Sequence, residues 1–260
     1  MCWEAAIWRG HRVKATNILE ASPSEQAKIL SHSPQAGGYA LLRLLAPRCA
    51  ASAQPGTMIH LSSGKLTHMT PLLRANPDAG WIDILYSATS TLASMDIATG
   101  TDHRVTLSTV PGGALTLPDR PYPLLIGDAV GTAPVVFMAD RIRQQKNLHP
   151  LVLLGYDTAP PFIAAPSRIL AQGMPSGVIA AIPLLDDWGI PSRLAHSQGQ
   201  PGCFEGTVDT LAGHWLGTLS DTQWAETEII VSGSNALINA VTALAHQYQM
   251  PCQTRHLTLA

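Results

Sequence analysis

Charged residues are scarce in this sequence, and aromatic residues are scarcer still. Of its 260 residues, 13% are charged and 5% are aromatic, and the formal net charge is −2. Proteins that bind nucleic acid usually carry a basic patch that attracts the phosphate backbone, so we expect no nucleic-acid partner. Apolar runs are also short. None approaches the ~20 residues that a helix needs to cross a bilayer, and we therefore expect no membrane span.

Cysteine is rare and scattered. The four cysteines, Cys2, Cys49, Cys203 and Cys252, form no Cys-x-x-Cys pair, and none of the 10 histidines is paired with another ligand at metal-binding spacing. Zinc sites and disulfide frameworks both depend on such spacing, so the sequence predicts no metal site and reduced thiols. Residues 1–4 have neither the basic nor the apolar region of a signal peptide. Together these features predict a cytoplasmic protein.

Glycine, with 21 residues, and proline, with 20, are plentiful and divide the first half into short segments. Residues 1–26 show little regular pattern and are predicted to form an N-terminal extension. Short apolar or alternating runs separated by turns, with almost no helical periodicity, predict an antiparallel β-barrel. The predicted strands are residues 27–31, 39–45, 57–61, 81–86 and 104–109.

The pattern changes near residue 118, where strands and helices begin to alternate. Predicted strands are residues 123–126, 151–155, 177–182, 193–196, 228–231 and 252–257, and predicted helices are 132–145, 206–219 and 235–248. This alternation indicates a parallel sheet with helices on both faces. The predicted fold is thus α/β plus β-barrel. Its domains are residues 1–118, an extension and FAD-type barrel, and residues 119–260, a nucleotide-binding α/β domain.

A glycine-bearing turn follows the first strand of the second half and leads directly into a helix. In it, Gly127 and Gly131 would let the backbone approach a ligand, and the helix start would offer N–H groups to phosphate. We therefore predict that Gly127, Ala129, Gly131 and Thr132 bind a cofactor, with Thr132 as the N-cap residue. An ordinary strand-to-helix turn is the alternative. Asp128 argues against phosphate, because a carboxylate repels it unless its side chain points away.

The end of the next parallel strand supplies another candidate. Open α/β sheets bind ligands at the carboxyl ends of their strands, and Tyr156 and Asp157 lie at such an end. We predict that Tyr156 contacts an adenosine, against the alternative of a structural role.

The order of these elements resembles that of the ferredoxin reductase-like flavoprotein superfamily. Within it, residues 27–255 look most like the electron-transfer subunit of dihydroorotate dehydrogenase. The resemblance rests on the turn at Gly127 and on Ala46-Pro47-Arg48-Cys49, Gln54-Pro55-Gly56, Ile84-Leu85-Tyr86, Gly202-Cys203-Phe204-Glu205-Gly206, Ile229-Ile230-Val231-Ser232-Gly233-Ser234 and Pro251-Cys252-Gln253.

This resemblance implies FAD on the barrel, NAD(P)H on the second domain and hydride transfer from the nicotinamide to the flavin. It also implies an electron acceptor or partner subunit. Ser232 and Gly233 occupy the place of the family's Cys-Gly beside the nicotinamide.

Three departures from the family are evident. The flavin-binding Arg-x-x-Ser is replaced by Thr67-His68-Met69-Thr70-Pro71, so that Arg74 supplies a cation to the flavin only if the loop is re-registered. The phosphate-binding Gly-x-Gly-Thr is replaced by the glycine-free stretch of residues 87–92. The cysteine-rich tail is missing, and because a cluster needs four thiolates we predict no [2Fe–2S] cluster. The alternative function is a degenerate, non-catalytic paralogue that keeps the fold as a partner or nucleotide-responsive subunit.

Overall fold

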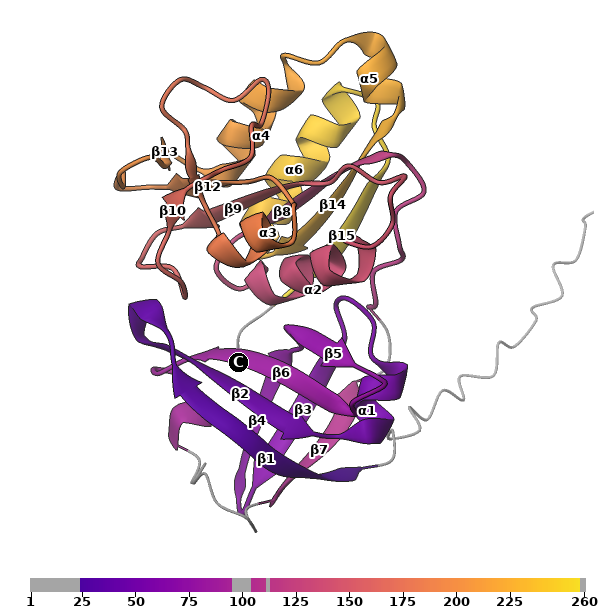
Figure 1. The fold of residues 1–260 in the computed structure, drawn as a ribbon, viewed down its shortest axis with the longest axis vertical. Coiled ribbons are helices and arrows are strands. Elements are labelled where there is room, and N and C mark those ends of the chain that lie inside the picture. The colour runs from indigo at the N-terminus through magenta and orange to yellow at the C-terminus, as the bar shows by residue number, and fades with distance from the viewer. Residues whose placement is uncertain (1–23, 95–103, 111–112, 258–260) are drawn as a thin grey trace, which may run out of the picture.

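The computed structural model of the chain describes residues 24–94, 104–110 and 113–257. It contains two large sheets and a two-stranded ribbon. The large sheets lie one above the other in Figure 1, with helix α2 (Thr132–Ile142) between them. The predicted extension, residues 1–26, lies outside the described residues except at its end, where strand β1 begins.

The first sheet has seven antiparallel strands, in the order β4-β3-β7-β1-β2-β6-β5, and confirms the predicted barrel. Its edge strands β4 and β5 follow one another in the chain. The strands are β1 (Glu25–Pro34), β2 (Tyr39–Leu45), β3 (Met58–Ser63), β4 (Leu66–Pro71), β5 (Arg74–Asn76), β6 (Trp81–Ser87) and β7 (Arg104–Val110), with short helices η1 (Ala36–Gly38), α1 (Pro47–Ser52) and η2 (Thr91–Ser94).

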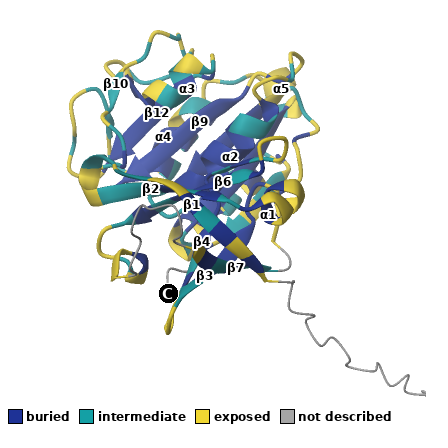
Figure 2. Ribbon diagram, turned by 60° about the horizontal axis from the view of Figure 1, so that its bottom comes forward, coloured by how far each residue is buried: buried dark blue, intermediate teal, exposed yellow. Residues whose placement is uncertain are grey.

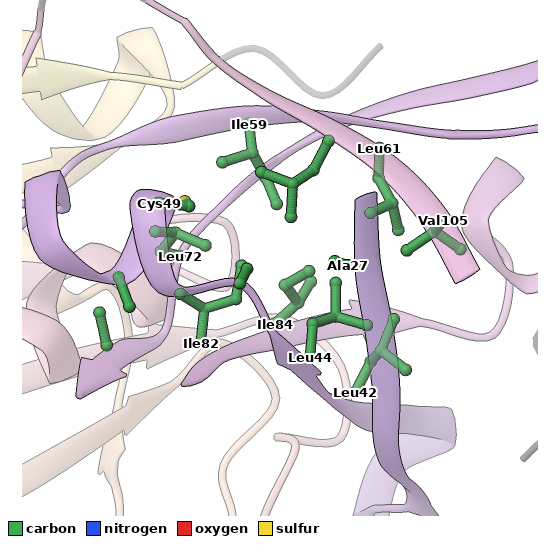
Figure 3. Packing of buried hydrophobic residues seen from close by; sticks show 14 of the residues in the cluster. Ala27, Leu42, Leu44, Cys49, Ile59, Leu61, Leu72, Ile82, Ile84 and Val105 are labelled. Atoms are coloured by element: carbon green, nitrogen blue, oxygen red, sulfur yellow. The ribbon is translucent and has the colours of Figure 1, made fainter. Parts of the chain in front are cut away.

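Alternate residues of these strands build the barrel core. Ile59 and Leu61 of β3 and Ile82 and Ile84 of β6 point into the same interior (Figure 3). Successive side chains of a strand point to opposite faces, so residues two apart share a face. Phe137 of α2 joins this cluster and is fully buried. Burial of each such side chain contributes about 1.5–3 kcal/mol, which fixes α2 on the barrel.

The second sheet is fully parallel and confirms the predicted α/β half. Its six strands follow the order β13-β12-β9-β8-β14-β15, and its central strands are buried (Figure 2). Helices α4 and α6 pack on one face, and α2 and α3 on the other. The elements are β8 (Tyr122–Gly127), β9 (Leu151–Tyr156), β12 (Ser192–His196), β13 (Phe204–Glu205), β14 (Thr227–Gly233), β15 (Cys252–His256), α3 (Pro183–Asp187), α4 (Val208–Leu216), α5 (Asp221–Ala225) and α6 (Asn235–Gln247).

The prediction that residues 177–182 form a strand of this sheet is wrong. Only Ala180–Ala181 (β11) is extended, and it pairs antiparallel with Ala165–Pro166 (β10). Gly177 has a left-handed φ of 82°, which interrupts the extended chain. The backbone N–H of Ala180 then donates to the carbonyl of Gly202, so it serves a loop rather than the main sheet.

Helix α2 is buried on nearly all sides because it separates the two sheets. Val135 and Met138 pack on the parallel sheet, whereas Ala133 and Val136 pack against Leu73 of the barrel. An apolar surface around the whole helix is what such a position requires. Val135 and Val136 face different neighbours because consecutive helical residues are about 100° apart. No helix among the described residues is long and apolar enough to span a membrane.

Candidate functional site

The chain order of the parallel sheet places a crevice between β8 and β14. From β8 the chain continues to β9 on one side and only later returns, as β14, on the other side. Open α/β sheets bind ligands where the strand order switches in this way, outside the carboxyl ends of the strands. Gly127 and Ser232 are paired across this point, so the two predicted loops meet there.

The carboxylate of Asp128 lies across this crevice. Its Oδ1 accepts a hydrogen bond of 3.0 Å from the N–H of Gly131, and its Oδ2 accepts one of 2.8 Å from the N–H of Ser234. These N–H groups belong to the starts of α2 and α6, where backbone donors lack partners within the helix and negative charge is favourable. Asp128 thus points into the crevice that the sequence predicted for phosphate.

The glycines of the two loops are explained by this close approach. A Cβ on Gly131 would lie 1.8 Å from the carbonyl oxygen of Ser232, and one on Gly233 would lie 2.5 Å from Oδ1 of Asp128. At Gly127 it would lie 2.8 Å from the side chain of Leu154. The glycines therefore let the loops pack on each other. Contacts of Gly127, Gly131, Ser232 and Gly233 with a cofactor stay a prediction.

Thr132 and Tyr156, predicted on separate grounds, are brought together. The Thr132 hydroxyl donates to the carbonyl of Asp128 at 3.1 Å and lies 2.7 Å from the phenol oxygen of Tyr156. Since the single Thr132 proton is already used, Tyr156 is the donor between them. Burial raises the pKa of Tyr156 far above its usual range, so this donor stays protonated. The N-cap position falls on Gly131, one residue before the predicted Thr132.

Two hollows flank Tyr156 and Asp157. The strand-end hollow, about 550 Å³, is lined by Asp128, Ala129, Val130, Gly155, Tyr156, Asp157, Gly206, Thr207, Val208, Asp209, Ser234, Ala236, Leu237 and Ala240. The His196 hollow, about 400 Å³, is lined by Tyr156, Asp157, Thr158, Ala159, Pro160, Phe162, Ala164, Leu194, Ala195, His196, Gln198, Gln200, Pro201 and Cys203. Neither has a Lys or Arg among its described lining residues.

His196 presents a hydrogen-bond donor in its hollow. The residue is 4% exposed, and its Nδ1 accepts a hydrogen bond of 3.2 Å from the N–H of Gln198. In the neutral ring the proton is therefore on Nε2. Gln198, Gln200 and Asp157 supply the other polar side chains of this hollow, beside the aromatic rings of Tyr156 and Phe162.

A third hollow, the junction slot, lies between the barrel and the start of α2. It encloses about 270 Å³ and is lined by Tyr39, His68, Thr70, Pro71, Leu85, Tyr86, Ser87, Thr89, Ser90, Ala129, Val130 and Ala133. Ala129 and Val130 therefore line both the junction slot and the strand-end hollow. Ala129 is the predicted site residue that joins the two halves of the fold.

The polar groups of the junction slot were not predicted from sequence. The phenol oxygen of Tyr86 lies 2.7 Å from Nε2 of His32, and Nδ1 of His68 lies 2.6 Å from the hydroxyl of Thr91. Burial lowers the pKa of His68 and raises the pKa of Tyr86, so both side chains are uncharged near neutral pH. The one available signal was the inverted pattern of β4, in which the polar His68 and Thr70 point inward.

Arg74 lies outside the junction slot. Its Nε and Nη2 donate to Oδ2 of Asp83 at 3.0 and 2.6 Å, while Nε of Arg43 donates to Oδ1 at 2.7 Å. Asp83 is fully buried, and both guanidinium groups contact the Trp81 ring. Arg74 is thus part of a network of charged side chains in the barrel. Its contact with a flavin stays a prediction.

The hydroxyl-rich turn after β6 is satisfied by its own hydrogen bonds. The hydroxyl oxygens of Ser87 and Thr89 lie 2.9 Å apart, and the Ser90 hydroxyl donates to the Ser87 carbonyl at 2.7 Å. A phosphate at this end of the junction slot would therefore have to replace existing bonds.

The described cysteines lie apart. Cys49 is buried in the barrel, Cys203 lines the His196 hollow and Cys252 lies in β15, and all three are free thiols. Among the described residues no three His, Cys, Asp or Glu side chains are grouped so as to hold a metal ion.

No protein-family model and no curated protein sequence matches the chain. Solved structures do match. The cytochrome P450 reductase GcoB of Amycolatopsis aligns with a TM-score of 0.65 at 12% identity, over 90% of this chain and 70% of that one. The FAD/NAD-binding domain of a Vibrio cholerae nitric oxide dioxygenase aligns with a TM-score of 0.64 at 12% identity, over 89% and 98%.

A Neisseria gonorrhoeae ferredoxin NADP⁺ reductase with bound FAD and NADP aligns with a TM-score of 0.60 at 11% identity, over 89% of this chain and 98% of that one. The chain therefore has the ferredoxin reductase-like fold, which confirms the resemblance at the level of the fold. Its predicted closeness to the dihydroorotate dehydrogenase subunit stays a prediction.

Proposed function

We propose that the protein is a ferredoxin reductase-like oxidoreductase or electron-transfer subunit that moves electrons from NAD(P)H through a flavin to an acceptor. The observation that carries the proposal is the wall formed by Ala129 and Val130, which is shared by the junction slot and the strand-end hollow. Rings that meet at the edge of this wall, where the two hollows adjoin, would be neighbours. Hydride transfer needs such neighbours, because the reacting atoms must approach to about 3–3.5 Å.

The junction slot fits the ring system of a flavin. Its walls are aromatic and apolar, through Tyr39, Tyr86 and Leu85, and Thr70 and His68 offer polar atoms at its edge. A flavin bound there would supply a two-electron acceptor that can release its electrons one at a time. The proposal concerns the flavin ring system and not the phosphates of FAD, because the hydroxyls of the turn after β6 are already engaged in hydrogen bonds within the turn.

The pyridine nucleotide is assigned to the two hollows beside Tyr156. The aromatic His196 hollow, which has no Lys or Arg among its described lining residues, suits an adenine ring, whose edge offers acceptors to Nε2 of His196 and to the amides of Gln198 and Gln200. The strand-end hollow leads from there toward Ala129. In this proposal residues 1–118 and 119–260 are the flavin and nucleotide domains.

An electron acceptor or partner subunit belongs to the same proposal, since the similar structures include proteins named as reductases of other proteins. We also propose that the protein works in the cytoplasm and carries no iron–sulfur cluster.

A non-catalytic paralogue is the second candidate function. It is favoured by the Asp128 carboxylate, which occupies the amides of the switch-point crevice, and by the sequestered Arg74. Such a protein would keep the fold as a partner subunit and have no turnover.

Titration with FAD, followed by gel filtration and an assay of NADH and NADPH oxidation with ferricyanide, separates the two. For the enzyme we expect FAD to be retained and Val130→Trp, which fills the shared wall, to weaken FAD binding at least about tenfold, or ~1.4 kcal/mol. Leu66→Trp is the control, because Leu66 lies on β4 but outside the junction slot. Protein that stays colourless with FAD and oxidises neither nucleotide would support the paralogue.

A further inference from the structure

We infer that Asp128 determines the ligand specificity of the switch-point crevice: it serves as a built-in anion and keeps phosphate out. The inference concerns the nucleotide site of the proposed function, but it is tested without flavin or electron transfer. A nucleotide that binds the natural chain would then hold its phosphates away from the junction of β8 and β14.

Both carboxylate oxygens of Asp128 are engaged with donors that a phosphate would use. One oxygen accepts from Gly131 at the start of α2, and the other accepts from Ser234 at the start of α6. Hydrogen bonds with an ionised acceptor are roughly twice as strong as neutral ones. A phosphate entering the crevice must displace two such bonds before it forms its own.

The backbone around Asp128 is shaped to this carboxylate. Gly233 has room for the Asp128 oxygens only because it lacks a Cβ, which would lie 2.5 Å from Oδ1. Gly131 likewise packs so closely on the Ser232 carbonyl that it has no room for a Cβ. The Thr132 hydroxyl donates a hydrogen bond to the backbone carbonyl of Asp128. The side chain is therefore held in place by both loops.

Electrostatics in the strand-end hollow act in the same direction. Asp128, Asp157 and Asp209 line it, and no Lys or Arg is among its described lining residues. A phosphate close to these carboxylates would meet like charges in a partly enclosed space, where their repulsion is stronger than in bulk water, so the phosphates of a bound nucleotide would lie on the solvent side of the hollow. Of the three carboxylates, Asp128 alone bonds to the backbone amides of α2 and α6, which makes its contribution separable.

The test is isothermal titration with inorganic pyrophosphate, together with the thermal shift that pyrophosphate causes. We expect Asp128→Gly to bind pyrophosphate at least about 100-fold more tightly than the natural chain, or ~2.7 kcal/mol, because it frees two amides and removes a charge. Asp128→Asn removes the charge but keeps one acceptor oxygen, so its gain should be smaller. If Asp128→Gly does not fold, Asp128→Asn alone decides the outcome: tighter pyrophosphate binding than in the natural chain supports the inference, and unchanged or weaker binding contradicts it.

Asp209→Asn is the matched control. It removes one charge from the same hollow and frees no backbone amide, so its gain should be on the order of threefold or less after screening by salt. Equal gains for Asp209→Asn and Asp128→Gly would overturn the inference in favour of a general effect of charge. So would the absence of a gain in both Asp128 variants, or tight pyrophosphate binding by the natural chain. The proposed function is tested by FAD retention and NAD(P)H oxidation in the natural chain. Because the pyrophosphate titrations measure neither of these, the failure of one proposal can be distinguished from the failure of the other.

Discussion

The phenol of Tyr156, at the end of β9, is hydrogen-bonded to the hydroxyl of Thr132, in the first turn of α2, across 2.7 Å. Thr132 in turn donates to the carbonyl of Asp128. This chain of two bonds connects the loop after β8 to the neighbouring strand. It fixes the residue whose carboxylate closes the switch-point crevice.

Tyr156→Phe should remove the end of this chain and little else. Loss of one buried hydrogen bond should lower the free energy of unfolding by about 1 kcal/mol, as measured by urea denaturation at pH 7. Tyr122→Phe, at an exposed position, is the control and should change it little. Equal losses in the two variants would argue against a structural role of the Tyr156 hydroxyl.

The same variant should change the stability at high pH. The pKa of Tyr156 is raised in the folded protein, whereas the unfolded phenol titrates near 10.0, so the unfolded state loses its proton first. Stability contributed by the protonated phenol is thus lost as pH rises above about 10. Tyr156→Phe should therefore show a shallower decline of unfolding free energy between pH 10 and 11 than the natural chain.

Gly131→Ala and Gly213→Ala should have opposite effects on stability. At Gly131 the added Cβ would lie 1.8 Å from a backbone oxygen, and backbone atoms cannot yield cheaply, so we expect a loss of at least about 3 kcal/mol. At Gly213, inside α4, the nearest atom is 3.5 Å away, and a gain of roughly 0.5–1 kcal/mol should follow from helix propensity. Thermal unfolding of both variants measures the difference. A tolerated Gly131→Ala would show that the two loops can separate.

The elements that sequence predicted are those whose hydrophobic pattern follows their burial. In β8 and β9 the continuous apolar runs match strands covered on both faces, and they were placed in the correct sheet. In β4 the pattern is inverted: His68 and Thr70 point inward because they line the junction slot. The inverted pattern concealed this strand, as expected where a candidate site breaks the local rules of folding.

The sequence predicted the loops of the candidate site but not the contacts between them. Gly131 and Ser232 are far apart in sequence, and only the pairing of β8 with β14 brings their loops together. The direction of the Asp128 side chain depends on Ser234, 106 residues away, so no local pattern reveals it. Arg74 is similar, since its partner Asp83 is found only once the register of β5 and β6 is known.

Asp83→Asn should be among the most destabilising single substitutions of the barrel. It leaves Arg43 and Arg74 without the carboxylate that both contact, at side-chain exposures of 32% and 19%. Removing one partner of a buried ion pair costs about 3–5 kcal/mol, and we expect the lower end because the arginines are partly exposed. Asp187→Asn breaks an exposed pair with Arg168 and should cost much less, because solvent screens the attraction between exposed charges. Comparable losses in urea denaturation would contradict the assignment.

Cys49 should be the least reactive of the described thiols. Burial, with a smaller contribution from Glu25, raises its pKa from an ordinary 9.0 to about 12. The thiolate is the reactive form, so alkylation by iodoacetamide at pH 8 should label Cys203, which is partly exposed, well before Cys49. Peptide mass spectrometry after timed labelling measures this order. Labelling of Cys49 at the rate of Cys203 would show that the barrel core opens readily.

Arg255→Ala should loosen the connection between the two sheets and, with it, the junction slot. Nε of Arg255, in β15, donates to the carbonyl of Gly56 in the barrel at 3.1 Å, and the N–H of Leu115 donates to Pro55 nearby at 2.8 Å. Loss of a hydrogen bond to a charged group should cost about 1.5–3 kcal/mol. The Leu115 amide should then exchange its hydrogen faster, which exchange monitored by mass spectrometry would detect.

Because the junction slot is lined by barrel residues on one side and by Ala129, Val130 and Ala133 at the start of α2 on the other, its shape depends on how the two halves of the fold are held together. We therefore expect Arg255→Ala to weaken FAD binding as well, although Arg255 does not line the slot. Arg104→Ala, at the exposed start of β7, removes the same charge without touching this connection and is the control. If Arg255→Ala accelerated exchange at Leu115 and left FAD binding unchanged, the slot would be formed by the barrel and the start of α2 alone, without a contribution from β15.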